Sequence, residues 1–216
     1  ISIEAKAIHI DTTVETPGNL EYVRDICRSM DIELFLVKPR LSYFEMVRRW
    51  GFPTMSRRWC KWRLKIRPTR RFIRSLALED LILVDGLRSS ESWIRKRMAN
   101  HRRIADGLTY HEALKCLVLH PVYKWSLDDI LNYIDMRGLC ENPLYDEFGK
   151  AFDCWCTVYK SPSNLVTLKY KSPRLFRQLM RLESELRSGG SAMFDRSRGK
   201  RLYLRDIDKR PQDYIL

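Results

Sequence analysis

The stretch IEAKAIHIDTTVETPGNLEYVRDICRSMDIELFLV, residues 3–37, sets the expected fold class of this chain. Residues 3–10 alternate and then run apolar, as a strand in a mostly buried sheet does. Residues 18–30 carry apolar side chains at helical spacing, and residues 32–37 form a second apolar run that ends before Pro39. A strand, a helix and a second strand in this order form a βαβ unit, so the sequence predicts a parallel sheet.

The rest of the chain adds further helices and strands to this unit. The predicted elements are, in chain order, helices over 42–50 and 69–79, a strand starting at 81, an apolar run over 117–122, and helices over 125–138 and 172–187. Ser126 is the expected N-cap of the helix over 125–138, because its hydroxyl can accept from a free backbone N–H of the first turn. Residues 189–201, GGSAMFDRSRGKR, are predicted to form a flexible basic loop.

The composition is that of a folded protein. The chain has 216 residues, of which 44% are hydrophobic and 31% charged, which is enough for one sizeable core or a core with a small subdomain. No apolar run approaches the roughly 18 residues of a membrane helix, and no secretory signal is visible. We therefore expect a cytoplasmic protein without a membrane partner. Because the chain begins at Ile1 and lacks an initiator Met, we expect a fragment, a processed chain or one that lacks its leading residues.

The net charge of +13, from 40 Lys and Arg against 27 acids, predicts an anionic partner such as a nucleotide, a nucleic acid or an acidic protein. Between Arg57 and Arg74 there are nine basic residues and no acid, with Trp59 and Trp62 between them. This segment is either a wall that meets a polyphosphate or nucleic-acid backbone, or a solvated helix face whose tryptophans pack inward. The sequence leaves both alternatives open.

The six cysteines are Cys27, Cys60, Cys116, Cys140, Cys154 and Cys156. Cys154 and Cys156 flank a tryptophan and form a metal site, a redox pair or two packed side chains. Cys60 lies in the basic stretch, where positive surroundings favour the thiolate. With Cys140 as the fourth ligand, four thiolates suit zinc or an iron–sulfur cluster. Cys27 and Cys116 lie on apolar runs and are predicted to be core residues.

Two polar loops leave predicted strand ends, where ligands bind to open parallel sheets. One begins Asp11-Thr12-Thr13 and the other is GLRSSES, residues 86–92. A glycine followed by arginine and serine offers N–H groups, a guanidinium fork and hydroxyls that suit phosphate or sulfate. The alternative is a strand-ending turn with polar groups at the surface.

Four segments in order resemble the phosphoadenosine phosphosulfate (PAPS) reductase family, which belongs to the adenine nucleotide alpha-hydrolase-like group. They are HIDTTVETPGNLEYVRDI (9–26), RRWCKWRLKIRP (57–68), VDGLRSSESWIRKR (84–97) and HPVYKWSLDDILNYIDMRGLCENPLYDEFGKAFDCWC (120–156). The resemblance extends from about residue 8 to 168. It includes the family's cysteine followed by lysine at C-x4-K spacing, and its Gly-x-Arg anion loop.

The resemblance implies a Rossmann-like parallel sheet with flanking helices and a helical C-terminal region. Residues 1–168 would form the nucleotide-binding domain, and 169–216 a C-terminal helix and basic tail. The bound molecule would be ATP or a PAPS-type adenine nucleotide. The residues that match are Lys65 and Arg88 as catalytic groups, Asp11, Thr12, Gly86, Arg88 and Ser89 as nucleotide-binding groups, and Cys60, Cys154 and Cys156 as ligands of a 4Fe–4S cluster or zinc. Cys140 would have to supply the fourth ligand.

The sequence departs from the family pattern in three places. The family's Ser-Gly-Gly-x-Asp-Ser loop should precede the strand over 3–10, and we expect a partner chain or missing leading residues to supply it, unless it is lost. The family pairs adjacent cysteines with CxxC, whereas this chain has Cys60 and a CxC. No cysteine follows Cys156, which counts against reduction of PAPS or adenylyl sulfate.

The expected function is therefore adenine-nucleotide-dependent sulfur chemistry. Its forms are sulfonucleotide processing and ATP-dependent sulfur transfer to a nucleic acid such as tRNA or DNA. The enzyme would be a sulfotransferase or reductase, or of the ATP pyrophosphatase type. The alternative is a non-catalytic nucleic-acid-binding subunit that kept the fold, for which the lack of the phosphate loop in this sequence is the argument.

Overall fold

The computed structural model describes residues 5–78, 80–93, 95–97, 107–148, 154–186, 189–195 and 199–215. The chain forms two compact units. The first unit joins Ile1–Pro68 to Asn142–Leu216, and the second unit is Thr69–Glu141. The predicted domain boundary at 168/169 falls inside helix α7, Pro162–Lys171, and stays a prediction.

The first unit contains the βαβ unit that the sequence predicts. Strands β1 (Lys6–Ile10) and β2 (Glu33–Val37) pair in parallel, and helix α1 (Asn19–Ser29) connects them. Parallel pairing brings the carboxyl ends of both strands to one edge. There the Asp11 N–H donates to the Val37 carbonyl (3.0 Å), so the loop after β1 starts in a defined position.

Helix α2 (Tyr43–Trp50) follows this edge of the sheet. Ser42 and Glu45 form a capping box at its N-terminus, because each side chain bonds to the other residue's backbone N–H. Gly51 ends the helix with a left-handed φ of 73° that favours glycine. The chain then enters the π-helix η1 (Lys61–Ile66) and helix α3 (Arg67–Ser75).

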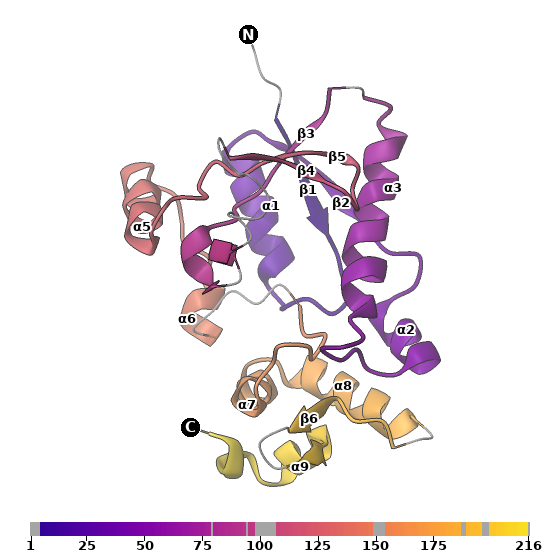
Figure 1. Ribbon diagram of the computed structural model, residues 1–216. Helices are drawn as coiled ribbons and strands as arrows, with labels where there is room; N and C mark the ends of the chain where they lie inside the picture. The colour runs from indigo at the N-terminus through magenta and orange to yellow at the C-terminus, as the bar shows by residue number, and fades with distance from the viewer. Residues whose placement is uncertain are drawn as a thin grey trace. The chain divides into compact units, whose positions relative to one another are not determined.

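The C-terminal half of the first unit is mainly helical (Figure 1). It consists of α6 (Leu144–Phe148), α7 (Pro162–Lys171), α8 (Pro173–Glu185), β6 (Met193–Asp195), β7 (Lys200–Leu202), α9 (Leu204–Lys209) and η3 (Pro211–Tyr214). Strands β6 and β7 are antiparallel, so the prediction of a flexible loop over 189–201 is wrong. Three-residue strands are too short to show an alternating pattern in the sequence.

One hydrophobic core joins the two halves of the first unit. Its fully buried side chains include Tyr43 and Val47 of α2, Trp155, and Leu165 and Ile207 of the C-terminal half. Cys60 and Cys156 belong to the same core. Because side chains far apart in the sequence fill one core, the helical C-terminal region and the N-terminal region stabilise each other.

A buried carboxylate holds the β6–β7 hairpin to α8. The Ala192 N–H donates to one carboxylate oxygen of Glu183 and the Leu204 N–H to the other, both at 2.7 Å. Glu183 is only 5% exposed. Burial raises the pKa of this carboxyl from 4.5 to about 7, against the opposing effect of the two backbone N–H bonds.

This carboxyl makes the stability of the fold depend on pH. Because the folded pKa lies above the ordinary value, the stabilisation is complete below about pH 4.5 and is lost as pH rises through 7. Between pH 4.5 and 7 we expect the free energy of unfolding of the wild type to fall by roughly 3 kcal/mol relative to that of Glu183→Gln. Urea unfolding at several pH values measures this difference. The control is Glu185→Gln, on the same helix and exposed; parallel pH profiles for wild type and Glu183→Gln would contradict the expectation.

The second unit contains a three-stranded sheet in the order β3-β5-β4. Strand β3 (Ile82–Val84) pairs in parallel with β5 (Cys116–Leu119), and β4 (Leu108–His111) is antiparallel to β5. A short 3-10 helix, η2 (Ser89–Glu91), follows β3, and helix α5 (Leu127–Met136) carries the predicted cap at Ser126.

The predicted α/β class with parallel strands is confirmed, with the parallel pairs in two short sheets. Cys27 and Cys116 are buried, as predicted for core residues. Within the described ranges, no helix has the length and apolar character that crossing a membrane requires.

Candidate functional site

Three cysteines of the first unit come together, and we call them the thiol cluster: Cys60, Cys154 and Cys156. The Sγ atoms of Cys60 and Cys156 lie 3.9 Å apart, and those of Cys154 and Cys156 lie 3.4 Å apart. Cys60 directly precedes the π-helix η1, a type of segment that is frequent at functional sites. The other two cysteines lie in the segment before α7.

The three thiols differ in how readily they lose a proton. The hydrogen bond with Cys156 lowers the pKa of Cys60, which makes Cys60 the thiol that ionises first. The bond with Cys156 and burial raise the pKa of Cys154 well above its usual range. For Cys156, the bond with Cys154 lowers the pKa, but the bond with Cys60 and burial outweigh it and raise it to about 11. Cys60 is therefore the best candidate nucleophile of the three.

The buried phenol of Tyr43 lies against the thiol cluster. Its hydroxyl donates to the Cys156 carbonyl (3.3 Å). Burial raises the pKa of Tyr43 well above 10, and the charge of Cys156 adds to this effect. Tyr43 therefore stays neutral and fixes the backbone at Cys156. Sequence reasoning placed Tyr43 only on a short helix; its contact with residue 156 arises from tertiary packing.

The loop that follows β1 is hydrogen-bonded to residues 154–156, which we call the thiol segment. The Trp155 N–H donates to the Val14 carbonyl (2.7 Å). The indole Nε1–H of Trp155 donates to Thr16 Oγ1 (3.0 Å), and both side chains are fully buried. The thiol cluster is thus attached to the strand edge at which open α/β sheets bind ligands.

Two predicted nucleotide-binding residues lie at this strand edge. Asp11 accepts from the Thr13 N–H (2.8 Å) and pairs with Lys38, which follows β2 (3.0 Å). Thr12 is 2% exposed, and its Oγ1 has no hydrogen-bond partner among the described residues. A buried hydroxyl in this state calls for an explanation, and a ligand at the strand edge is one.

Lys65, the predicted catalytic lysine, lies half-buried on η1. Its positive charge acts on the Cys154 thiol and lowers the pKa of that thiol against the larger effects of burial and the Cys156 bond. The structure therefore brings Lys65 near the thiol cluster, while its predicted catalytic role stays a prediction.

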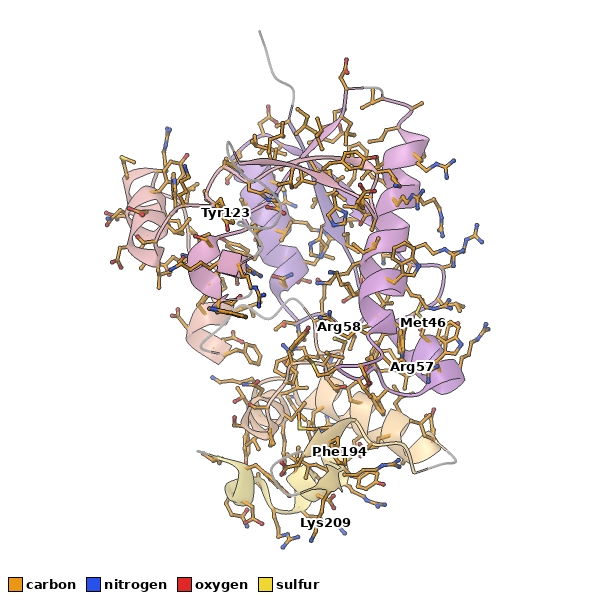
Figure 2. The ribbon with its side chains drawn as sticks, viewed as in Figure 1. Met46, Arg57, Arg58, Tyr123, Phe194 and Lys209 are labelled. Carbon is orange, nitrogen blue, oxygen red and sulfur yellow. The ribbon has the colours of Figure 1, made fainter. Side chains whose placement is uncertain are left out.

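The basic stretch between Arg57 and Arg74 is neither entirely an exposed wall nor entirely a helix face with its tryptophans packed inward. Trp59 packs inward, with its ring stacked on Tyr43 (5.9 Å between centroids), whereas Trp62 is exposed. Arg57 and Arg58 are exposed in the segment before η1 (Figure 2). Arg58 contacts Tyr159 by its guanidinium, which donates to the phenol oxygen. The segment thus combines one partly buried tryptophan with a basic surface.

The Gly-x-Arg loop lies in the second unit. Asp85 anchors it, because one carboxylate oxygen accepts from the Leu87 N–H (3.0 Å) and contacts His120 Nδ1 (2.5 Å). The Ser89 N–H donates to the Tyr123 carbonyl (2.8 Å). No described heavy atom lies within 4 Å of the point where a Cβ would stand at Gly86, so this part of the loop backbone can be approached closely.

Arg88 is largely buried, with 16% of its side chain exposed. Its Nε lies 3.5 Å from Glu91. One terminal nitrogen of the guanidinium is buried and has no hydrogen-bond partner among the described residues. An unpaired guanidinium nitrogen next to an open loop is suited to a phosphate or sulfate oxygen.

Asp85 and His120 are site-loop residues that sequence reasoning missed. His120 is buried, and its second ring nitrogen contacts Thr109 Oγ1 (2.9 Å). The chain Asp85–His120–Thr109 therefore joins the ends of all three strands of this sheet. A polar residue directly after each of the runs LILV and LVL was the available signal.

The fourth predicted metal ligand, Cys140, is exposed and belongs to the second unit. In the part of the chain that the structure describes, no group of three or more His, Cys, Asp or Glu side chains is arranged to hold a metal ion. A 4Fe–4S cluster or zinc at these four cysteines stays a prediction, and metal and acid-labile sulfide analysis of protein purified without oxygen tests it.

Comparison with known proteins extends this picture. Residues 1–178 match the family described as the phosphoadenosine phosphosulfate reductase domain. The chain belongs to the PAPS reductase domain family. The structure is also similar to that of a PAPS reductase from Candida auris, solved as a phosphate complex, with a TM-score of 0.51, 19% identity and 70% of each chain covered. That likeness shows the fold.

The curated relatives that the chain matches are distant. An uncharacterised protein of Methanocaldococcus jannaschii is 22% identical over 81% of this chain, and adenosine 5'-phosphosulfate reductase of Oceanobacillus iheyensis is 24% identical over 74%. The chain spans 40% of the length of the first and 64% of the second. A second uncharacterised protein of M. jannaschii is 24% identical, and the chain spans 34% of it.

Proposed function

We propose that this PAPS reductase-like chain is an adenine-nucleotide-dependent enzyme of sulfur chemistry. The nucleotide, ATP or a sulfonucleotide, would bind at the carboxyl edge of β1 and β2. The thiol cluster would be the sulfur-handling group of the reaction. Of the branches that the family resemblance implies, sulfur transfer to a nucleic-acid acceptor agrees best with the net charge of +13.

The observation that carries this proposal is the bonding of the thiol segment to the strand-end loop. Trp155, between two of the thiols, bonds to Val14 and Thr16 of the loop after β1. A nucleotide that binds beyond the strand ends would therefore lie near a thiolate. Such proximity is what a transfer between a phosphate or sulfate end and sulfur requires.

The residues at this edge have separate roles in the proposal. The orphaned hydroxyl of Thr12 would bond to the nucleotide. Lys65 would stabilise the negative charge that develops on the phosphate or sulfate end as the bond to it breaks. Cys60, whose pKa is lowered by Cys156, would be the reacting thiolate, since thiolates are far better nucleophiles than thiols.

Lys65→Met provides a direct test on the first unit. Methionine keeps the length of the side chain and removes its charge, so we expect the affinity for ATP to fall about tenfold, as for the loss of one charged hydrogen bond. The affinity for adenosine, which carries no phosphate, stays unchanged. Calorimetric titration of both molecules measures the two affinities.

The matched control is Lys61→Met on the same π-helix, where the lysine is exposed. This variant changes the net charge equally and is expected to bind ATP like the wild type. Equal losses in both variants would assign the effect to net charge alone. Unchanged ATP binding in Lys65→Met would remove Lys65 from the proposed site.

A further inference from the structure

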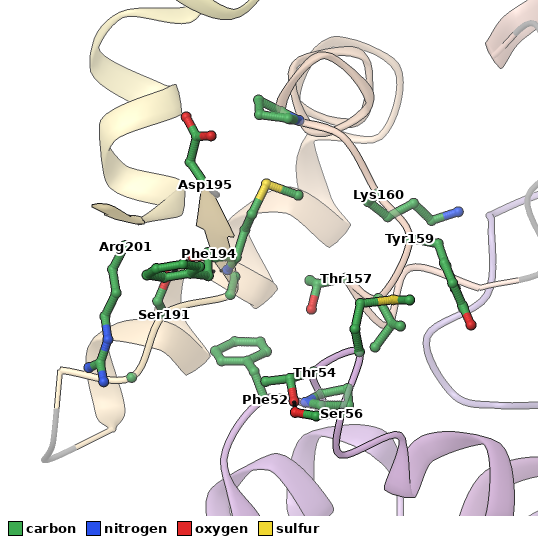
Figure 3. Close-up of a pocket in the computed structure, with 17 residues that line it drawn as sticks. Phe52, Thr54, Ser56, Thr157, Tyr159, Lys160, Ser191, Phe194, Asp195 and Arg201 are labelled. Carbon is green, nitrogen blue, oxygen red and sulfur yellow. Dashed lines mark hydrogen bonds between the residues drawn. The ribbon is translucent and has the colours of Figure 1, made fainter. Parts of the chain in front are cut away.

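A cavity of about 870 Å³ lies in the first unit, beside the thiol segment but outside the strand edge (Figure 3). It is formed by three stretches that are distant in sequence: the loop 52–56, the segment 157–162 that follows the thiols, and the β6–β7 hairpin. Its volume falls in the range of pockets for small molecules, which includes a single nucleotide. The family resemblance assigns no residue of this cavity.

The aromatic residues Phe52, Tyr159 and Phe194 border the cavity. Phe194 of β6 is 55% exposed and Tyr159 is 65% exposed, although both border the cavity. Phe52, in the loop 52–56, is buried. Figure 3 shows the rings of Phe52 and Phe194 toward the interior of the cavity. Exposed rings of this kind are platforms on which a planar base can stack.

A cation stands beside the exposed ring of Phe194. Arg201 of β7 is the direct cross-strand partner of Phe194, so both side chains project from the same face of the hairpin. Lys160 belongs to the opposite wall. The hydroxyls of Thr54 and Ser191 and the carboxylate of Asp195 also line the cavity. A carboxylate can accept from the exocyclic amino group of a base, and an arginine next to a ring suits its phosphate.

The cavity wall is joined to the thiol cluster. Thr157 follows Cys156 directly and its hydroxyl donates to the Cys156 carbonyl (2.7 Å). Thr157 and Tyr159 both have a left-handed backbone, with φ of 67° and 65°, which is unusual for residues other than glycine and strained for a β-branched one. A molecule held in the cavity therefore lies next to a constrained segment that starts at the reacting sulfurs.

We propose that this cavity binds one base, together with its adjacent phosphate, of a single-stranded nucleic acid. The inference rests on the proposed function, because it names the class of acceptor: the base would stack on Phe194, and Arg201 would bind the phosphate. The net charge of +13 and the exposed arginines before η1 favour a polyanion over a neutral ligand.

The test measures binding of short fluorescein-labelled single strands, one of DNA and one of RNA with the same sequence, by fluorescence anisotropy. We expect Phe194→Ala to weaken binding about tenfold, as for the loss of one stacked base. Arg201→Ala should weaken binding about fivefold. It should also lower by about one the slope of log affinity against log salt concentration, because one phosphate contact fewer releases one counterion fewer. Because Phe194 is half-exposed, its removal should leave the far-ultraviolet circular dichroism unchanged.

Lys200→Ala is the matched control. Lys200 neighbours Arg201 on β7 but is not among the residues that line the cavity. It removes the same charge and should change binding by less than about twofold, because Lys200 would make no direct contact with the bound phosphate. Equal effects of Arg201→Ala and Lys200→Ala, or wild-type binding by Phe194→Ala, would overturn the inference. If Phe194→Ala fails to fold, the comparison of Arg201→Ala with Lys200→Ala still tests the inference.

Titration with ATP separates this inference from the proposed function. Phe194→Ala is expected to bind ATP like the wild type, because the cavity is not at the strand edge. A wild-type protein that binds the strands as expected but does not bind ATP supports the cavity and contradicts the proposed function. If Phe194→Ala weakens ATP and the strands equally, the cavity is the nucleotide site and the inference is wrong. Stronger binding of either strand identifies RNA or DNA as the acceptor.

Discussion

Replacing Arg88 by alanine is expected to lower the affinity for ATP about 100-fold and to leave the affinity for adenosine unchanged. The family resemblance assigns Arg88 to the phosphate or sulfate end of the nucleotide. Arg88 is largely buried, and one of its guanidinium nitrogens has no partner among the described residues, so an anion bound there would gain charged hydrogen bonds away from water. Bonds to charged groups contribute about 1.5–3 kcal/mol, and a buried fork lies at the upper end of this range. Calorimetric titration with both molecules measures the two affinities.

The fold should tolerate this change, because Glu91, the carboxylate beside Arg88, also pairs with Arg95. The control is Arg137→Ala, which removes an exposed arginine of the same unit at the end of α5 and should bind ATP like the wild type. Wild-type affinity for ATP in Arg88→Ala would exclude Arg88 from nucleotide binding.

Cys60→Ser is expected to reduce the nucleotide-dependent reaction by about 10³-fold or more, with ATP affinity unchanged. Serine has nearly the size of cysteine, but its hydroxyl does not ionise near neutral pH, so the thiolate of the cluster is lost. An anaerobic assay with ATP or adenylyl sulfate, a sulfide donor and a single-stranded acceptor measures AMP release and sulfur in the acceptor. A loss in rate without a loss in binding separates chemistry from folding.

The matched control is Cys27→Ser, which changes a buried cysteine of α1 that is outside the thiol cluster. We expect Cys27→Ser to react at nearly the wild-type rate. Any decrease should be no larger than a slightly less stable fold causes. If Cys60→Ser retains the wild-type rate, the thiol cluster is structural. If Cys27→Ser loses as much as Cys60→Ser, the loss reports on the fold. Iron, zinc and acid-labile sulfide in the same preparations test the metal prediction.

Local signals in the sequence were sufficient for the βαβ unit and for several helix ends. The periodicity over 3–37 predicted β1, α1 and β2 in their observed places, because the burial of each residue in a helix or strand follows from neighbours a few positions away. Ser126 caps α5 for the same reason. Helix α7, with Ser161 as its cap and Pro162 in its first turn, carried equally local signals, and these were overlooked.

The candidate site was predicted in part, through the family resemblance. Cys60, Cys154 and Cys156 were named together, and the structure brings them together. Cys140 was added to complete a set of four ligands, which is a chemical requirement of a metal and not a signal in the residues around position 140. The chain Asp85–His120–Thr109 was missed because a histidine on its own at the end of an apolar run does not specify its partners.

The amino-acid sequence by itself determined the fold class, the helix caps and the family, since these depend on short-range periodicity and on motifs in order. Only the tertiary structure decided that Cys60 contacts Cys156, that Trp155 bonds to Thr16, and that three separate segments enclose a cavity beside the thiols. These contacts join residues about a hundred or more positions apart. No local pattern encodes such a contact, because it forms only when side chains from both halves of the first unit pack into one core.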